Sequence, residues 1–156
     1  TLEENALIKA RSYARRSGLT TLADDSGLEV DALGGAPGVH SKRFAGDNAT
    51  DEERVAYLLQ RLEGTPPEER TAAFRCVLAI AAPDGRALTR EGVCRGIIVE
   101  APRGSGGFGY DPVFWIPEMG RTMAELTPSE KNRVSHRAMA AREAAELLLG
   151  SEVSSW

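Results

Sequence analysis

The sequence has 156 residues and a formal net charge of -4; 42% of the residues are hydrophobic and 27% are charged. This length predicts one domain, and the composition excludes a disordered chain, collagen and a coiled coil. The acidic balance argues against a nucleic-acid polymer as partner, and no apolar run is long enough to span a membrane. The two cysteines, Cys76 and Cys94, form neither a disulfide framework nor a zinc site, and we expect buried thiols.

The first half of the chain predicts two helices and one strand. Apolar residues at three- and four-residue spacing indicate a helix over 2–17, which Gly18 ends. Residues 20–24 predict a short buried strand that ends in acidic residues. Many glycines within 27–49 indicate loops and turns. A capping-box pattern begins a second helix, over about 50–62.

The second half begins with a predicted hairpin. Apolar, β-prone residues indicate strands over 71–82 and 87–100, joined by a turn at 83–85. Residues 103–109 are rich in glycine, and residues 112–116 predict a short aromatic strand. The hairpin and this strand extend the sheet that residues 20–24 begin.

The chain closes with a further helical segment. Thr127 and Glu130 form a capping box, which predicts a helix or a pair of helices up to Gly150. Residues 151–156 are expected to be a frayed tail. The element order predicts a single α/β domain over 1–150, with a mixed central sheet and helices packed around it.

Two adjacent acids, Asp24 and Asp25, directly precede Ser26 and Gly27 at the end of the first predicted strand. Neighbouring side chains on a strand point to opposite faces, so one carboxylate can line a cleft while the other caps a turn or supports its neighbour. Carboxylates in this arrangement can bind Mg²⁺ and orient a water molecule for phosphoryl chemistry. The alternative interpretation is a solvated Asx turn.

The segment 104–111 is a second candidate for chemistry. Its glycines allow backbone to approach a ligand closely, and Phe108 and Tyr110 offer flat faces for a base. The spacing is neither that of a Walker loop nor that of a Rossmann fingerprint. The alternative is a flexible connection between strands.

Two helical segments carry further polar candidates. Lys131, His136 and Arg137 could be fixed donors for carbonyl or phosphate oxygens, although a solvated helix face has the same composition. Asn5 and Lys9 share a helix face because they are four residues apart, and Lys9 could reach a phosphate.

Taken in chain order, these motifs resemble one family, the Ham1-like (inosine triphosphatase-type) nucleoside-triphosphate pyrophosphatases, which include the bacterial dITP/XTP pyrophosphatases. The matching runs span nearly the whole chain and are specific in combination: 4–10, 23–28, 32–38, 41–44, 106–112, 124–127, 130–131 and 135–137.

The resemblance implies a reaction, a fold and a metal. The reaction is hydrolysis of ITP, dITP or XTP to the monophosphate and pyrophosphate, and the cofactor is Mg²⁺. By motif, Asp25 would be the general base and a Mg²⁺ ligand, Asp24 would support it, and Ser26 would contact the substrate. The implied fold is a curved mixed sheet with a nucleotide cleft between two lobes, in a cytoplasmic homodimer.

The resemblance also assigns the purine pocket. Phe108 would stack on the purine, and a donor such as Arg137 would pair with the oxygen at position 6. Adenine carries an amine there and would leave that donor unpaired, at a cost of about 1–3 kcal/mol. The remaining implied contacts are Gly109, Tyr110, Asp111, Lys131 and His136 for the base and Lys9 for a phosphate.

The sequence departs from the family pattern at its start. Members begin with a strand, a Ser/Thr-Gly-Asn-x-x-Lys phosphate loop and a second acidic metal ligand, whereas this sequence starts at Thr1 in the following helix. We therefore expect an N-terminally incomplete domain that is poorly active alone and aggregates through an unpaired sheet edge.

Two other functions stay open at this stage. One is a nucleotide-binding module without catalysis, because the phosphate loop is absent. The other is a Maf-type pyrophosphatase that acts on other nucleotides. The Phe-Gly-Tyr-Asp run ending at Asp111 and the Ser-His-Arg run ending at Arg137 argue against the Maf-type enzyme.

Overall fold

The computed structural model describes residues 1–150 and Val153. The strands form one sheet in the order β2-β1-β3-β4-β5-β6. The chain divides into two compact units, of which the first contains residues 1–26, 75–93 and those from 135 onward, and the second contains 27–74 and 94–134. Three long strands contribute residues to both units: β1 (Thr21–Val30), β3 (Thr71–Ala81) and β4 (Ala87–Ile98).

Helix α1 (Leu2–Ser17) opens the first unit and has strong signals at both ends. Thr1 accepts a hydrogen bond from the backbone N–H of Glu4, and the Glu4 side chain bonds back to Thr1, which completes a capping box. Gly18 ends the helix in the left-handed conformation, at φ 71°, which glycine adopts without steric cost. The predicted helix over 2–17 is confirmed.

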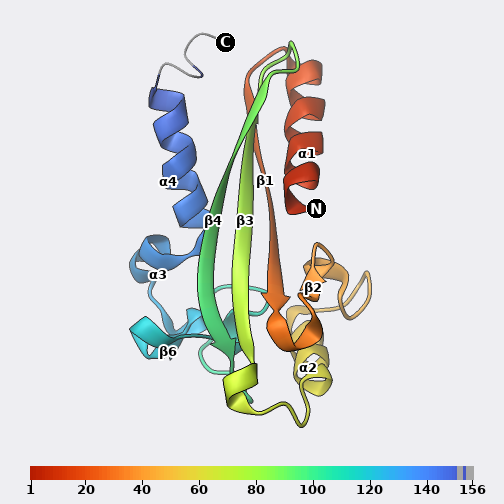
Figure 1. The fold of residues 1–156 in the computed structure, drawn as a ribbon, viewed down its shortest axis with the longest axis vertical. Coiled ribbons are helices and arrows are strands. Elements are labelled where there is room, and N and C mark those ends of the chain that lie inside the picture. The colour runs from red at the N-terminus through yellow and green to blue at the C-terminus, as the bar shows by residue number, and fades with distance from the viewer. Residues whose placement is uncertain (151–152, 154–156) are drawn as a thin grey trace. The chain divides into compact units, whose positions relative to one another are not determined.

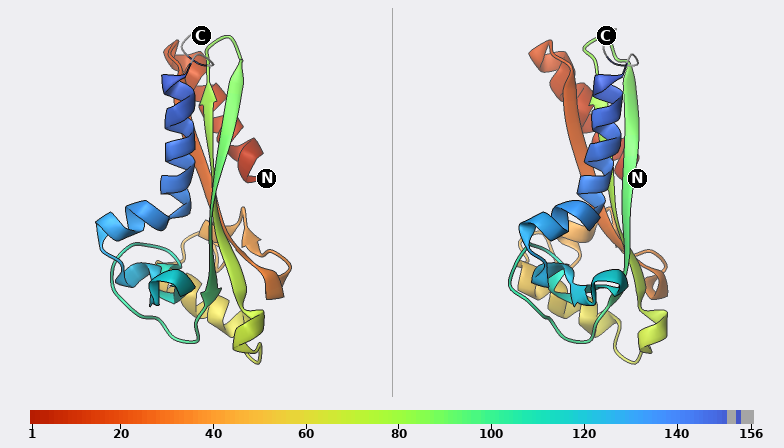
Figure 2. Two further views of the ribbon diagram at one scale, coloured as in Figure 1. Left: turned by 60° about the vertical axis from the view of Figure 1, so that its left-hand side comes forward. Right: turned by 90° about the vertical axis from the view of Figure 1, so that its left-hand side faces the viewer.

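The first unit packs one helix on each face of the middle strand, β3, and Figures 1 and 2 show these helices on opposite sides of it. Side chains of a strand alternate between its faces. The side chains that pack between α1 and one face are Ala6, Ala10, Ala14, Val77, Ala79 and Ala81. Those between the other face and helix α4 (His136–Leu149) are Cys76, Leu78, Ile80, Ala140, Ala144 and Leu147.

Helix α4 approaches the sheet closely because β4 has a glycine beneath it. A Cβ atom at Gly92 would overlap the backbone carbonyl of His136 and the backbone nitrogen of Ala140. Ser135 begins this helix by accepting a hydrogen bond from the N–H of Ala138, at 3.2 Å. The close approach at Gly92 places the first turn of α4 directly against β4.

The second unit is built around aromatic and aliphatic side chains. The rings of Phe74 and Phe114 lie 4.5 Å apart, and Leu28, Val55 and Leu58 pack in the same cluster. The elements that belong wholly to this unit are β2 (Pro37–Gly38), α2 (Asp51–Arg61), β5 (Phe114–Ile116), β6 (Arg121–Thr122) and α3 (Pro128–Val134), with short 3-10 turns between them.

The predicted α/β class and most of its elements are confirmed. The capping box of Thr50 begins α2, and the helical segment after Thr127 is a pair of helices. The β1–β2, β4–β5 and β5–β6 pairs are antiparallel, whereas a mixed sheet was expected. The two residues of β2 and of β6 are too few for their hydrophobic pattern to indicate a strand.

Two predicted boundaries were wrong. Strand β1 continues to Val30, into the segment where glycines suggested loops, because Leu28 and Val30 are fully buried in the second unit. The strand expected over 112–116 begins at Phe114, since Asp111–Val113 form a 3-10 turn. The predicted tail over 151–156 lies, apart from the buried Val153, outside the described residues.

Both cysteines are free and buried, as expected. Burial raises the pKa of the Cys76 thiol and raises that of Cys94 to about 11, so both thiols are protonated at neutral pH. Among the described residues, no helix combines the length and the apolar character that crossing a membrane requires.

Candidate active site

Asp25 is held by the first helix. Lys9 Nζ lies 2.7 Å from Asp25 Oδ1, and Asn5 Nδ2 donates to Asp25 Oδ2 at 3.1 Å. Lys9 also donates to the backbone carbonyl of Asp24. The four-residue spacing of Asn5 and Lys9 therefore places one amide and one cation on the two oxygens of a single carboxylate.

Asp24 is held from the opposite helix. The Nε and Nη2 atoms of Arg137 each lie 3.0 Å from Asp24 Oδ2, and Nη2 lies 3.5 Å from Ser26 Oγ. Cys76 Sγ also contacts Asp24 Oδ2, at 3.9 Å. Because α1 and α4 cover opposite faces of β3, Asp24 and Asp25 point to opposite faces of the sheet, as strand alternation predicted.

The charges of this cluster are balanced, and its side chains are only partly exposed. The Asp25 side chain is 21% exposed and that of Asp24 is 37% exposed. One cation, Lys9 or Arg137, faces each carboxylate. Each carboxylate oxygen has about two lone-pair directions, so Asp25 can still offer oxygen to a further ligand.

The donor set suits a metal that the substrate helps to bind. Among the residues that the structure describes, no group of three or more His, Cys, Asp and Glu side chains could hold a metal ion. Mg²⁺ at nucleotide sites usually takes one or two protein carboxylates and completes its shell with phosphate oxygens and water. Asp25 can supply one such carboxylate, whereas Asp24 points to the opposite face of the sheet.

The glycine-rich segment lies in the second unit and closes on Asp111. This carboxylate is buried, with its side chain 3% exposed; it accepts from the N–H of Phe108 at 3.0 Å and pairs with Lys131 at 2.5 Å. A Cβ atom at Gly107 would overlap Asp111 Oδ2, so only glycine allows this close approach.

The two aromatic residues of this segment have different environments. Phe108 is 58% exposed, and Lys131 Nζ lies 4.7 Å from the centre of its ring. Tyr110 is 4% exposed, and its hydroxyl donates to the carbonyl of Ser41 at 2.7 Å. Burial raises the pKa of Tyr110 to about 12, which keeps it protonated as a donor. The expectation that both rings offer a flat face was therefore wrong for Tyr110.

The predicted residues fall into two groups, one in each unit. The first unit holds Lys9, Asp24, Asp25, Ser26, His136 and Arg137, and the second holds Phe108, Gly109, Tyr110, Asp111 and Lys131. His136 is 5% exposed, and its backbone carbonyl faces Gly92.

Sequence reasoning did not predict the contact of Asp51 with this segment. Asp51 Oδ2 accepts a hydrogen bond from the N–H of Gly109, at 2.6 Å. Asp51 directly follows the capping residue Thr50, in the first turn of the helix, where acidic residues are common because they interact favourably with the helix dipole. The sequence shows only that the capping box at Thr50 precedes the glycine-rich segment 104–111, and this order gives no indication of a contact between them.

Comparisons with known proteins identify relatives of the chain. The sequence profile of the Ham1 family matches residues 1–147. The chain is 57% identical over 140 residues to a dITP/XTP pyrophosphatase of Geobacillus kaustophilus, which covers 90% of this chain and 69% of that protein. A dITP/XTP pyrophosphatase of Thermus thermophilus is 56% identical over 146 residues, covering 94% of this chain and 70% of the relative.

Solved structures give the same result for the fold. A Ham1 protein from Coxiella burnetii superposes with a TM-score of 0.91 at 48% identity, covering 96% of this chain and 77% of its own. The Ham1 protein of Staphylococcus aureus gives a TM-score of 0.91 at 41% identity and the same coverage. With a family profile over 1–147 and relatives above half identity, the chain belongs to the Ham1 family.

Proposed function

We propose that this protein hydrolyses deaminated purine nucleoside triphosphates, ITP, dITP and XTP, to the monophosphate and pyrophosphate. The observation that carries the proposal is the pair Asp24 and Asp25, each held by a cation from a different helix. Relatives more than half identical to the chain are dITP/XTP pyrophosphatases, and the Ham1 match does not favour a Maf-type enzyme.

Asp25 is the proposed general base. It takes a proton from a water molecule whose oxygen attacks the α-phosphorus, while the bond to the oxygen that bridges the α- and β-phosphates breaks and pyrophosphate leaves. Lys9 and Asn5 keep the carboxylate in a fixed orientation during this transfer. Such a reaction needs alignment and charge stabilisation and no covalent intermediate.

Asp25 is also the residue that would hold Mg²⁺, and Asp24, on the other face of the strand, would support it. When bound, the ion would neutralise part of the triphosphate charge. Lys9 and Arg137 supply fixed positive charge beside the middle of β1, one on each face of the sheet. The expected homodimer and cytoplasmic location stay predictions.

The proposed purine contact is the exposed ring of Phe108, backed by Lys131 and Asp111. Discrimination against adenine would follow from a fixed donor opposite position 6. Arg137, the donor that the sequence suggested, instead bonds Asp24 in the first unit through Nε and Nη2, and its proposed role is to supply positive charge there. An unpaired donor costs about 1–3 kcal/mol, which corresponds to roughly 5- to 150-fold in rate.

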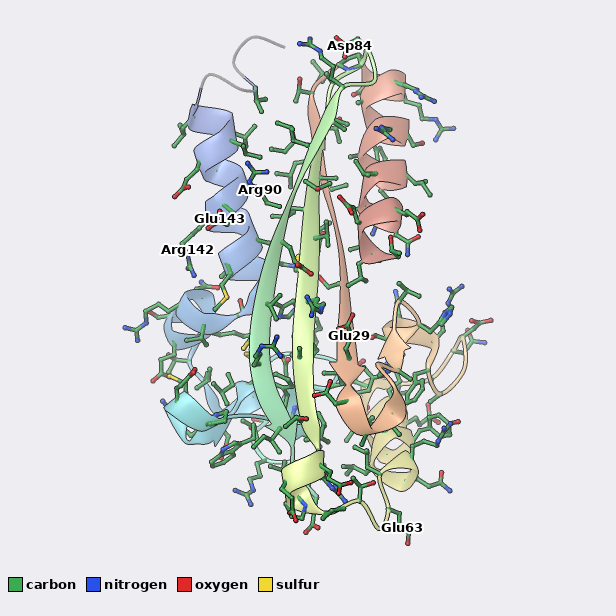
Figure 3. All side chains as sticks on the ribbon, in the orientation of Figure 1. Glu29, Glu63, Asp84, Arg90, Arg142 and Glu143 are labelled. Carbon is green, nitrogen blue, oxygen red and sulfur yellow. The ribbon has the colours of Figure 1, made fainter. Side chains whose placement is uncertain are left out.

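The test is pyrophosphate release from ITP, XTP, ATP and GTP in the presence of Mg²⁺. We expect ITP and XTP to react at least about tenfold faster than ATP. Asp25→Asn keeps the size of the side chain but removes the base, so ITP turnover falls by about 10²- to 10⁴-fold. The matched control is Asp84→Asn, at the tip of the β3–β4 hairpin (Figure 3).

Three results would count against the proposal. Equal rates on all four triphosphates would contradict the substrate preference. Full activity in Asp25→Asn would contradict the role of that carboxylate. Calorimetric binding of ITP without turnover would favour the alternative, a nucleotide-binding module without catalysis.

A further inference from the structure

Three successive residues of the glycine-rich segment are each anchored by a different partner. The N–H of Phe108 donates to Asp111, the N–H of Gly109 donates to Asp51, and the hydroxyl of Tyr110 donates to the carbonyl of Ser41. Asp111 was predicted as a base contact and lies three residues from Phe108, whereas Asp51 comes from α2, 58 residues before Gly109 in the chain. The helix terminus therefore contacts the backbone directly beside the exposed ring of Phe108.

The backbone around Phe108 needs external anchors. Gly107 and Gly109 flank it, with φ of 74° and 61°, and neither has a side chain to restrict its rotation. Glycine loses more conformational freedom on ordering than any other residue. Phe108 is 58% exposed and its ring lies against Lys131, and the hydrogen bonds from the N–H groups of Phe108 and Gly109 hold the backbone from which the ring projects.

Asp51 is itself held firmly at the start of α2. Its Oδ1 atom pairs with Arg54, which leaves Oδ2 for Gly109. The Arg54 side chain is 12% exposed and also donates to the carbonyls of Lys42, at 3.0 Å, and Ala49, at 2.5 Å. The hydrogen bond from Gly109 lowers the pKa of Asp51, and Arg54 adds to this, so the carboxylate is ionised at neutral pH.

We propose that Asp51 is a positioning residue that acts through Gly109 to hold the Phe108 ring ready for the purine. The inference rests on the proposed function, because the purine is the ligand of that ring. Without Asp51 the segment samples more conformations, and substrate binding must then supply the ordering free energy. The effect belongs to binding, since Asp51 touches no reacting atom.

The experiment compares Asp51→Ala and Asp51→Asn in steady-state hydrolysis of ITP and in amide hydrogen exchange of residues 104–111. Asp51→Ala removes a charge-assisted hydrogen bond, so we expect KM for ITP to rise about tenfold while kcat changes less than about threefold. Exchange at 104–111 should become faster in the same variant. Asp51→Asn keeps an oxygen that can accept from the N–H of Gly109. Its KM and its exchange at 104–111 should therefore stay close to the wild-type values.

The matched control is Thr50→Ala, which removes the hydrogen bond that the Thr50 side chain accepts from the N–H of Glu53. It weakens the same helix end without touching Gly109. It should leave KM and the exchange of 104–111 unchanged. An unchanged KM in Asp51→Ala, or equal effects in Thr50→Ala, would overturn the proposal. If the wild type does not hydrolyse ITP, the proposed function fails; unchanged exchange in Asp51→Ala would then refute the anchor separately, and faster exchange would support it.

Discussion

Asp24 and Asp25 are neighbours in the chain, yet a different helix holds each of them. Lys9 of α1 pairs with Asp25, and Arg137 of α4 pairs with Asp24. The alternation of a strand separates the two carboxylates, so their partners cannot be exchanged. The pair Asp24–Arg137 has side chains 37% and 47% exposed, and an ion pair with this exposure contributes little to stability.

This exposure allows the catalytic role of Arg137 to be separated from a structural one. We expect Arg137→Ala to change the free energy of unfolding by less than about 1 kcal/mol. Turnover of ITP should fall at least about tenfold, because a fixed cation is lost beside Asp24. Urea unfolding and pyrophosphate release measure the two effects. Arg142→Ala, on the same helix (Figure 3), is the control, and a turnover loss explained fully by unfolding would contradict the role.

At the scale of elements, helix α3 depends on one carboxylate. Glu130 pairs with Arg121 of β6 at 2.6 Å, and its other oxygen accepts from the backbone and hydroxyl of Thr127, at 2.9 and 3.0 Å. It thus caps the helix and joins it to the sheet. Lys131, which contacts Phe108 and Asp111, is the next residue, so this network positions a proposed substrate contact.

The pKa of Glu130 predicts how stability changes in acid. Arg121 and Thr127 lower it from 4.5 to about 2 in the folded protein. Between those values the unfolded chain binds more protons, so stability is present above pH 4.5 and is lost as pH falls toward 2. We expect Glu130→Gln to be less stable at pH 7 and to show a flatter decline in this window.

Urea unfolding at a series of pH values measures this difference. Glu63→Gln, which removes a carboxylate from another part of the same unit (Figure 3), is the control for general charge effects. Parallel curves for the wild type and Glu130→Gln between pH 4.5 and 2 would show that Glu130 does not carry this pH dependence.

At the scale of the whole molecule, three continuous strands join the two compact units. β1, β3 and β4 each contribute residues to both units, so neither unit has a complete set of strands of its own. Loss of either unit would leave half of each strand without its packing. We therefore expect the units to unfold together.

The prediction is a single unfolding transition in urea. Far-UV circular dichroism and the fluorescence of Trp115, measured in a Trp156→Phe background, should give coincident curves, as two-state unfolding requires. Two transitions at different urea concentrations would show instead that the units unfold separately, despite the shared strands.

Local chemistry in the sequence was enough to determine most elements and several contacts. The capping boxes at Thr50 and Thr127 mark helix starts because the partners are three residues apart. The spacing of Asn5 and Lys9 placed both on one face of α1, and strand alternation separated Asp24 from Asp25. Each of these relations needs only the period of a helix or a strand.

Only the tertiary structure decided which distant residues meet. The contacts of Asp51 with Gly109, of Arg137 with Asp24 and of Tyr110 with Ser41 each join segments more than 50 residues apart. Tyr110 looked like an open face for a base and is instead a buried donor, because burial depends on what packs against a residue. Long-range pairing follows from the packing of the whole chain, and no local period encodes it.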